Sequence, residues 1–218
     1  LNLLVIGEPD ESKNTIWVTA RQHPGESMAE WFMEGFITRL LDDEDGVARK
    51  LLDENVFYVV PNMNPDGSVR GHLRTNAVGT NLNREWAEPS LEKSPEVFYV
   101  LKRMQETGVD MFLDVHGDED LPYNFVAGCE GIPSYDDRHK ELEDTFKAAF
   151  LAATPEFQTE YGYERDEPGK ANMTVANSAV GERFKCLSYT LEMPFKDNAN
   201  LPDEDFGWSV ARCQRLGE

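Results

Sequence analysis

The sequence has few cysteines and few basic residues, and each shortage excludes a class of protein. Its three cysteines, Cys129, Cys186 and Cys213, are too few and too far apart for a disulfide framework or a Cys-x-x-Cys metal site. Only 21 Lys and Arg residues stand against 41 Asp and Glu residues, so the formal net charge is -20. Because nucleic-acid binding depends on cationic side chains that neutralise phosphates, we expect no nucleic-acid partner.

Long apolar runs and internal repeats are also missing. Apolar runs such as residues 57–60 are far too short to cross a bilayer, so we expect no membrane partner. Hydrophobic residues still make up 40% of the 218 residues, which is enough to build the core of one domain. The scarcity of cysteine favours a reducing compartment, and we expect a cytoplasmic protein. Nothing in the sequence indicates an oligomeric state.

Apolar residues are spaced so that strands and helices alternate along the chain. Short apolar runs rich in β-branched and aromatic residues predict buried strands, and apolar residues at helical spacing predict helices. Such alternation predicts an α/β sheet with helices on its faces. The expected strands cover residues 3–6, 15–19, 56–60, 111–115 and 186–191, and the expected helices cover residues 27–41, 94–106, 137–152 and 206–216. Between them, residues 61–93 show little periodicity, and a loop of that length usually binds or catalyses.

The first candidate site is the segment His23-Pro24-Gly25-Glu26, which follows the strand expected over residues 15–19. A tight turn at Pro24 and Gly25 can direct the side chains of His23 and Glu26 at one point. Imidazole nitrogen and carboxylate oxygen are both suitable zinc ligands. On its own a His-x-x-Glu pattern is common, and an ordinary surface loop explains it equally well.

His116 is the third candidate ligand, because it ends the strand expected over residues 111–115 and precedes Gly117. Ligands gather at the carboxyl ends of strands in open α/β sheets, so His23, Glu26 and His116 can converge. Three protein ligands leave one coordination position open, as in catalytic zinc sites. The simpler interpretation is a histidine that merely ends a strand. Asp114 points to the same strand face as His116, and either supports it or is an ordinary solvated or capping residue.

Glu192 ends the strand expected over residues 186–191, shortly before Pro194. A carboxylate placed there beside zinc could take a proton from water and pass it to a leaving amine. Among 41 acidic residues an ordinary strand-end acid is the default interpretation. The position directly after a buried strand favours the functional interpretation.

The aperiodic segment 61–93 carries Arg74 and the adjacent pair Asn83-Arg84. Arginine pairs carboxylates bidentately and asparagine adds further donors, so this pair suits the terminal carboxylate of a peptide. A second arginine near a metal could stabilise an oxyanion. Taken singly, each arginine is equally well explained as a solvated loop residue.

Together these segments resemble the zinc metallocarboxypeptidases, and the cytosolic carboxypeptidase branch more than the digestive enzymes. No single segment is specific, but the joint pattern is. The resemblance implies a mixed, eight-stranded twisted α/β sheet with helices on both faces. It also implies that residues 1–218 are a catalytic domain, truncated at both ends, without the β-rich domain that usually precedes it in this branch. The matching segments are His23-Pro-Gly-Glu26, Asn64-Pro-Asp-Gly67, Arg74, Leu82-Asn83-Arg84, Asp114-Val-His116-Gly117 and Tyr189-Thr-Leu-Glu192.

The resemblance further implies a role for each candidate residue. It implies that His23, Glu26 and His116 bind one zinc ion and that Glu192 is the general base. Arg74 would polarise the scissile carbonyl. Asn83 and Arg84 would bind the terminal carboxylate of the substrate.

Two positions are less well defined by the resemblance. The family uses a tyrosine near the substrate, and Tyr163 is our candidate, with Tyr161 as the alternative. Many relatives have an aspartate where this chain has Asn81, and that aspartate supports a metal-bound histidine. Because an amide adds no negative charge, we expect somewhat weaker zinc binding here.

The implied substrate is the C-terminus of a peptide or protein, with a preference for acidic C-terminal residues. Such a preference requires a cation in the specificity pocket, and Lys170 is our candidate, with Arg183 as the alternative. Two rival functions stay open. Amidohydrolases of the aspartoacylase and succinylglutamate desuccinylase type share a related His-x-x-Glu site, although the Pro-Gly-Glu turn favours the peptidase. A non-catalytic pseudo-peptidase could bind peptide tails, but the metal and base residues are all present.

Overall fold

Four parallel strands form the centre of a mixed six-stranded sheet, in the order β1-β3-β2-β4-β6-β5. The computed structural model describes all residues from 1 to 218. The two edge strands, β1 and β5, run antiparallel to their neighbours β3 and β6. The strands are β1 (Leu4–Ile6), β2 (Asn14–Ala20), β3 (Asn55–Val60), β4 (Met111–Asp118), β5 (Phe125–Ala127) and β6 (Leu187–Pro194).

The sheet therefore has six strands, and the expectation of eight was wrong. The number eight came from the family resemblance, whereas the apolar runs of this chain predict only five strands. Those five are present as β1, β2, β3, β4 and β6. The sixth strand, β5, is only three residues long, too short for its apolar residues to be distinguished from a loop by periodicity.

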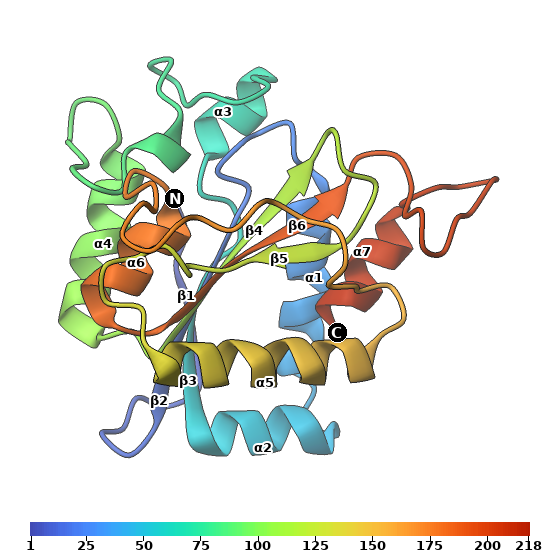
Figure 1. Ribbon diagram of the computed structural model, residues 1–218, viewed down its shortest axis with the longest axis horizontal. Helices are drawn as coiled ribbons and strands as arrows, with labels where there is room; N and C mark the ends of the chain where they lie inside the picture. The colour runs from blue at the N-terminus through green and yellow to red at the C-terminus, as the bar shows by residue number, and fades with distance from the viewer.

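Helices cover both faces of the sheet, as the alternating pattern predicts (Figure 1). Helices α1, α2, α5 and α7 lie on one face, and α4 and α6 lie on the other. The sequence patterns missed α2, α3 and α6, and α7 begins later than residue 206. None of the helices is long and apolar enough to span a bilayer. The helices are α1 (Met28–Leu40), α2 (Gly46–Glu54), α3 (Pro65–Arg70), α4 (Pro95–Thr107), α5 (Asp137–Ala153), α6 (Ala176–Phe184) and α7 (Val210–Gly217), with a 3-10 turn η1 (Leu82–Arg84).

Side chains that alternate along the strands supply two hydrophobic cores, one on each face of the sheet. Val18 of β2 and Val115 of β4 belong to the core beneath α1, which contains 19 buried residues. Trp17 and Phe112, the neighbouring pair on the same two strands, belong to the core beneath α4, which contains 17. The sheet is thus buried on both sides, which explains why its central strands are largely apolar.

The aperiodic segment 61–93 lies across the carboxyl ends of the parallel strands and is firmly packed. It contains α3 and η1, and its residues Met63, Leu82 and Trp86 are fully buried in the second core. The N–H of Met63 donates to the carbonyl of Ala20 at 2.8 Å, which ties the segment to the end of β2. Residues carried by this segment are therefore held in fixed positions above the sheet.

Candidate active site

The carboxyl ends of β2, β4 and β6 meet at one edge of the sheet. Beyond the end of β2 the chain reverses at Arg21, whose φ of 56° lies in the left-handed region. Two hydrogen bonds hold this turn, from the Arg21 N–H to the carbonyl of Val115 at 3.2 Å and from Arg21 Nε to the carbonyl of Pro24 at 3.0 Å. His116 on β4 and Glu192 on β6 are register partners at the same edge.

The His23–Glu26 turn requires glycine at its third position. A Cβ on Gly25 would lie 2.8 Å from Leu73 Cδ1 and 2.9 Å from the Leu73 carbonyl oxygen. The Gly25 N–H donates to that same carbonyl at 2.9 Å. This close approach between the turn and segment 61–93 explains the glycine in the motif and brings Arg74, the next residue, to the edge of the site.

His23, Glu26 and His116 each direct one donor atom to a common point, and these atoms lie within 4.8 Å of one another. Glu26 lies between the two imidazoles, with Oε1 2.6 Å from His23 Nδ1 and Oε2 2.8 Å from His116 Nδ1. All three side chains are buried. Two imidazoles and one carboxylate form a donor set that suits zinc and leaves a fourth coordination position.

The far nitrogen of each imidazole has its own acceptor. His116 Nε2 lies 2.7 Å from Asp114 Oδ2, and because a carboxylate only accepts, this nitrogen carries a proton. His23 Nε2 lies 3.0 Å from Asn81 Oδ1, which likewise accepts. In both residues the Nδ1 atom is therefore the one left to bind a metal.

The charges of these three residues are strongly coupled. Burial would raise the pKa of Glu26, but the imidazoles of His116 and His23 lower it to about 2. Burial lowers the pKa of His23, partly opposed by its hydrogen bond to Glu26. Burial also acts to lower the pKa of His116, but Asp114 and Glu26 raise it above its ordinary value. Two acidic groups around one buried imidazole make a site that favours a cation.

Glu192 is buried next to this group and is incompletely hydrogen-bonded. The hydroxyl of Tyr163 donates to Glu192 Oε1 at 3.2 Å and also contacts Asp118. Glu192 Oε2 is buried without any partner in the protein. Burial raises the pKa of Glu192 to about 8; His116 opposes this rise, and Glu26 and Asp118 add to it. An unpartnered buried carboxylate oxygen in the same cleft as the ligand group fits a site that receives a water or a metal ion.

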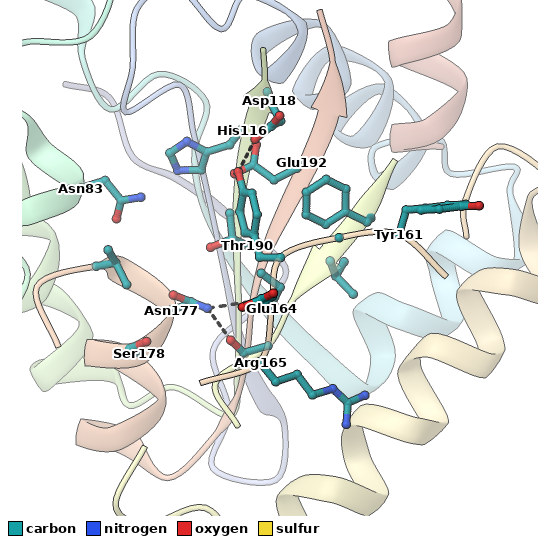
Figure 2. Close-up of a pocket in the computed structure, with 18 of the residues that line it drawn as sticks. Asn83, His116, Asp118, Tyr161, Glu164, Arg165, Asn177, Ser178, Thr190 and Glu192 are labelled. Atoms are coloured by element: carbon teal, nitrogen blue, oxygen red, sulfur yellow. Dashed lines mark hydrogen bonds between the residues drawn. The ribbon is translucent and has the colours of Figure 1, made fainter. Parts of the chain in front are cut away.

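A cleft of about 960 Å³ contains these residues and most of the predicted substrate contacts. Figure 2 shows His116, Asp118 and Glu192 together at one end, with Thr190 next to them and Asn177, Ser178 and Arg165 farther along. Lys170 and Arg183 do not line the cleft; both are exposed elsewhere on the surface. The predicted residues that line it are His23, Glu26, Arg74, Asn83, Arg84, His116, Tyr161, Tyr163 and Glu192.

Asn83, Arg84 and Arg74 place free donors in the cleft. The Asn83 carbonyl oxygen Oδ1 accepts from the N–H of Ala176 at 2.8 Å, which leaves its amide NH₂ free. Arg84 Nη1 donates to the backbone carbonyl of Asn83 at 2.6 Å, and burial and then Arg74 lower the Arg84 pKa. Arg74 makes no hydrogen bond or ion pair within the protein. The two neighbouring guanidinium groups are thus available to an anion.

Several cleft residues carry no signal in the sequence. Lys147 of α5 and Glu130 line the far part of the cleft, and Arg165 lies on the same strip of chain as Tyr163. Lys147 sits among ordinary helix residues, so only the fold reveals its position. Thr190 is an exception, because it lies two residues before Glu192 on one strand, and the period-two rule places both on the same face.

Comparisons with known proteins find related sequences and related structures. The family model described as zinc carboxypeptidase matches residues 1–207. An uncharacterised protein of Zymomonas mobilis is 55% identical over 95% of this chain and 54% of its own length. Mouse cytosolic carboxypeptidase 3 is 36% identical over 56% of this chain and 12% of its own length. The crystal structure of a metallo-carboxypeptidase from Burkholderia cenocepacia has 54% identity and a TM-score of 0.95, covering 99% of this chain and 58% of that one. This chain thus spans about half the length of the bacterial proteins that it matches.

Proposed function

Because the chain belongs to the zinc carboxypeptidase family, we propose that it forms the catalytic part of a zinc-dependent metallocarboxypeptidase. Such an enzyme would hydrolyse the C-terminal peptide bond of peptides or proteins. The observation that supports this most strongly is the convergence of one donor atom each from His23, Glu26 and His116 within 4.8 Å. Glu192, with its unpartnered buried oxygen, lies beside them in the same cleft.

Each residue has a distinct task in the proposed reaction. Zinc, when bound by the two histidines and Glu26, supplies Lewis acidity toward a carbonyl and toward water. Glu192 accepts a proton from the attacking water and returns it to the departing amine, so the proton balance of the hydrolysis is closed.

The arginines would orient the substrate. Arg84 and the free amide of Asn83 bind the terminal carboxylate, which places the last peptide bond at the metal end of the cleft. Arg74 stabilises negative charge that develops on the scissile carbonyl oxygen. Tyr163 donates to Glu192 at 3.2 Å, so its hydroxyl can redirect to the substrate when that carboxylate is engaged.

The test is metal analysis combined with a substrate panel. We expect the purified full-length protein that contains this chain to bind one zinc ion. It should release the last residue of peptides only when zinc is bound. An amidohydrolase would instead cleave N-acyl amino acids and leave peptides intact. A pseudo-peptidase would bind peptide tails with no release of amino acids. Either result would contradict the proposed function.

The residue preference is a finer part of the proposal. We propose a preference for acidic C-terminal residues, with Lys147 and Arg165 as the cations that attract the side chain. Both line the cleft, whereas Lys170 does not. Lys147 lies 3.5 Å from Glu130 Oε1 and 3.8 Å from Glu143 Oε2. These long ion pairs leave its ammonium able to turn toward a ligand carboxylate. Burial, then Glu130, raises the pKa of Glu143.

A preference for basic residues is the second candidate, and Glu130 is the observation that favours it. Its carboxylate lines the cleft between Lys147 and Arg165 and could bind a cationic side chain. Two substitutions separate these alternatives on peptides that end in Glu, Lys or Phe. If the pocket is cationic, Lys147→Met should lower kcat/KM for the Glu peptide about tenfold or more, and Glu130→Gln should raise kcat/KM for the same peptide.

The opposite pattern, with Glu130→Gln lowering kcat/KM for the Lys peptide, would support the basic preference and contradict the acidic one. Lys140→Met is the matched control, because Lys140 lies on α5 but pairs with Asp144 on the exposed side. The Phe peptide reports any general damage to the active site.

We also propose a cytoplasmic location, supported by three buried cysteines without a disulfide.

A further inference from the structure

A chain of buried hydrogen bonds connects segment 61–93 to the metal ligand His116. The indole N–H of Trp86 donates to Gln22 Oε1 at 2.8 Å. Gln22 Nε2 donates to Asp114 Oδ2, and the same oxygen accepts from His116 Nε2 at 2.7 Å. Trp86, Gln22 and Asp114 are each 0% exposed, so water cannot replace any of these contacts.

Trp86 determines which way the Gln22 amide points. An indole N–H can only donate, so the Gln22 oxygen must face Trp86 and its NH₂ must face Asp114. If the amide were reversed, its NH₂ would face the indole N–H and its oxygen would face the Asp114 carboxylate. Both contacts would then be unfavourable, in a place where water cannot relieve them.

The fixed amide in turn leaves only one arrangement for His116. Gln22 Nε2 lies 3.5 Å from His116 Nε2, but two N–H groups cannot bond to each other. The His116 N–H is therefore directed to Asp114 alone. Thr19 Oγ1 donates to the second carboxylate oxygen, Oδ1, at 2.7 Å, so the fully buried carboxylate of Asp114 has three donors.

We propose that Gln22 and Trp86 are positioning residues that fix the orientation of the metal ligand His116 through Asp114. This inference rests on the proposed metal site, but none of the three residues touches the metal or the substrate. The same hydrogen-bond chain links His116 to the proposed carboxylate-binding residues, because Trp86 follows Asn83 and Arg84 on the same packed turn. The backbone N–H of Trp86 donates to the carbonyl of Thr174 at 3.1 Å, and this turn therefore has little freedom to move.

Trp86→Phe removes the donor and keeps an aromatic ring, and Trp17→Phe is its matched control. Both tryptophans are 0% exposed and belong to the same core of 17 residues. The indole N–H of Trp17 also makes one hydrogen bond, to Thr107 Oγ1 at 3.2 Å, but that bond lies far from the metal ligands along the sheet. The two substitutions therefore cost similar packing, and only Trp86→Phe frees the Gln22 amide.

The first measurement is the zinc dissociation constant, obtained by competition with a chelator. We expect Trp86→Phe and Gln22→Met each to weaken zinc binding about tenfold, as loss of a partner behind a metal-binding histidine does, and Trp17→Phe to leave it unchanged. The double variant Gln22→Met/Trp86→Phe should bind no more weakly than Gln22→Met alone, because Trp86 acts only through Gln22. Equal zinc affinities in Trp86→Phe and Trp17→Phe, or additive losses in the double variant, would overturn the inference.

The second measurement does not need zinc. In the metal-free protein the His116 Nε2 proton should exchange slowly with water and give a resolved imidazole N–H signal by NMR. We expect this signal to persist in Trp17→Phe and to broaden in Trp86→Phe and Gln22→Met. If it is unchanged in all of them, the positioning role is wrong. If instead the wild-type protein binds no zinc, the proposed function fails while this measurement still reports on the network.

Discussion

His116 on β4 and Glu192 on β6 are direct register partners in adjacent parallel strands. Both are buried, at 1% and 6% exposed, and both point to the end of the sheet where the chain turns from β2 into the His23–Glu26 segment. The backbone ladder therefore fixes the spacing between a proposed metal ligand and the proposed base. No loop has to close to bring these two side chains together, and the base is preorganised by the sheet itself.

The first prediction concerns Glu192. Glu192→Gln keeps the size and shape of the side chain but removes its capacity to accept a proton. We expect kcat on peptide substrates to fall about 10³-fold, within the range for loss of a general base. Zinc content should be unchanged, because Glu192 is not one of the three ligands. Turnover that survives the substitution would show that another group accepts the proton.

The second prediction concerns Asn81, whose Oδ1 lies 3.0 Å from His23 Nε2. Asn81→Asp keeps an acceptor at that position and adds a negative charge behind the imidazole. We expect the zinc dissociation constant to decrease about tenfold, since charged partners raise the basicity of a ligating histidine. Asn200→Asp, an exposed position, adds the same charge to the protein and should have no effect. Equal behaviour of the two variants would mean that Asn81 does not tune the ligand.

The third prediction concerns Glu143, which is 3% exposed and accepts a hydrogen bond from the Tyr135 hydroxyl. Burial, followed by Glu130, raises its pKa above the ordinary value of 4.5. Between the unfolded and the folded pKa the native state holds more protons than the unfolded state. The contribution of Glu143 to stability is therefore greatest at acidic pH, and it is lost as the pH rises through the pKa of Glu143 in the folded state.

Glu143→Gln should remove this dependence. Urea titrations give the free energy of unfolding of each protein. We expect the value for the variant minus the value for the wild type to increase from pH 5 to pH 8. Glu141→Gln, on the exposed side of the same helix, is the control and should run parallel to the wild type. A Glu143→Gln curve that also runs parallel to the wild type would show that this carboxyl has the same pKa in both states.

The fourth prediction concerns the three cysteines, which are all buried. Burial raises the pKa of the Cys186 and Cys213 thiols to about 12 and raises that of Cys129 as well. Because the thiolate is the reactive form, we expect almost no labelling of the native protein by a thiol reagent at pH 8. All three should react once the chain is unfolded in urea. Rapid labelling of one thiol in the native protein would reveal local opening around it.

The central sheet and the convergence of the candidate site residues could be predicted from the sequence for one physical reason. Parallel strands buried on both faces are largely apolar, so His116 and Glu192 stand out near the carboxyl ends of their strands. The carboxyl ends of parallel strands share one edge, so residues far apart in the chain could be expected to meet there. The structure brings His23, Glu26, His116 and Glu192 into one cleft, as that reasoning predicts.

Other features could not be predicted because they depend on tertiary packing. The six-stranded sheet differs from the expected eight because that number came from the family and not from apolar runs. Lys170 was chosen from local sequence, and only the fold reveals that Lys147 on α5 lines the cleft while Lys170 does not. Trp86 would be assigned to the core on composition, and its hydrogen bond to Gln22 becomes visible only when segment 61–93 is placed above the sheet.

The most direct test of the metal site is the zinc stoichiometry of the wild type and two histidine variants. His116→Ala removes a proposed ligand, and His72→Ala removes a histidine outside the ligand group. We predict one tightly bound zinc ion per chain in the wild type and in His72→Ala, and its loss in His116→Ala. A wild-type protein that binds no zinc, or a His116→Ala variant that retains it with undiminished affinity, would contradict the account.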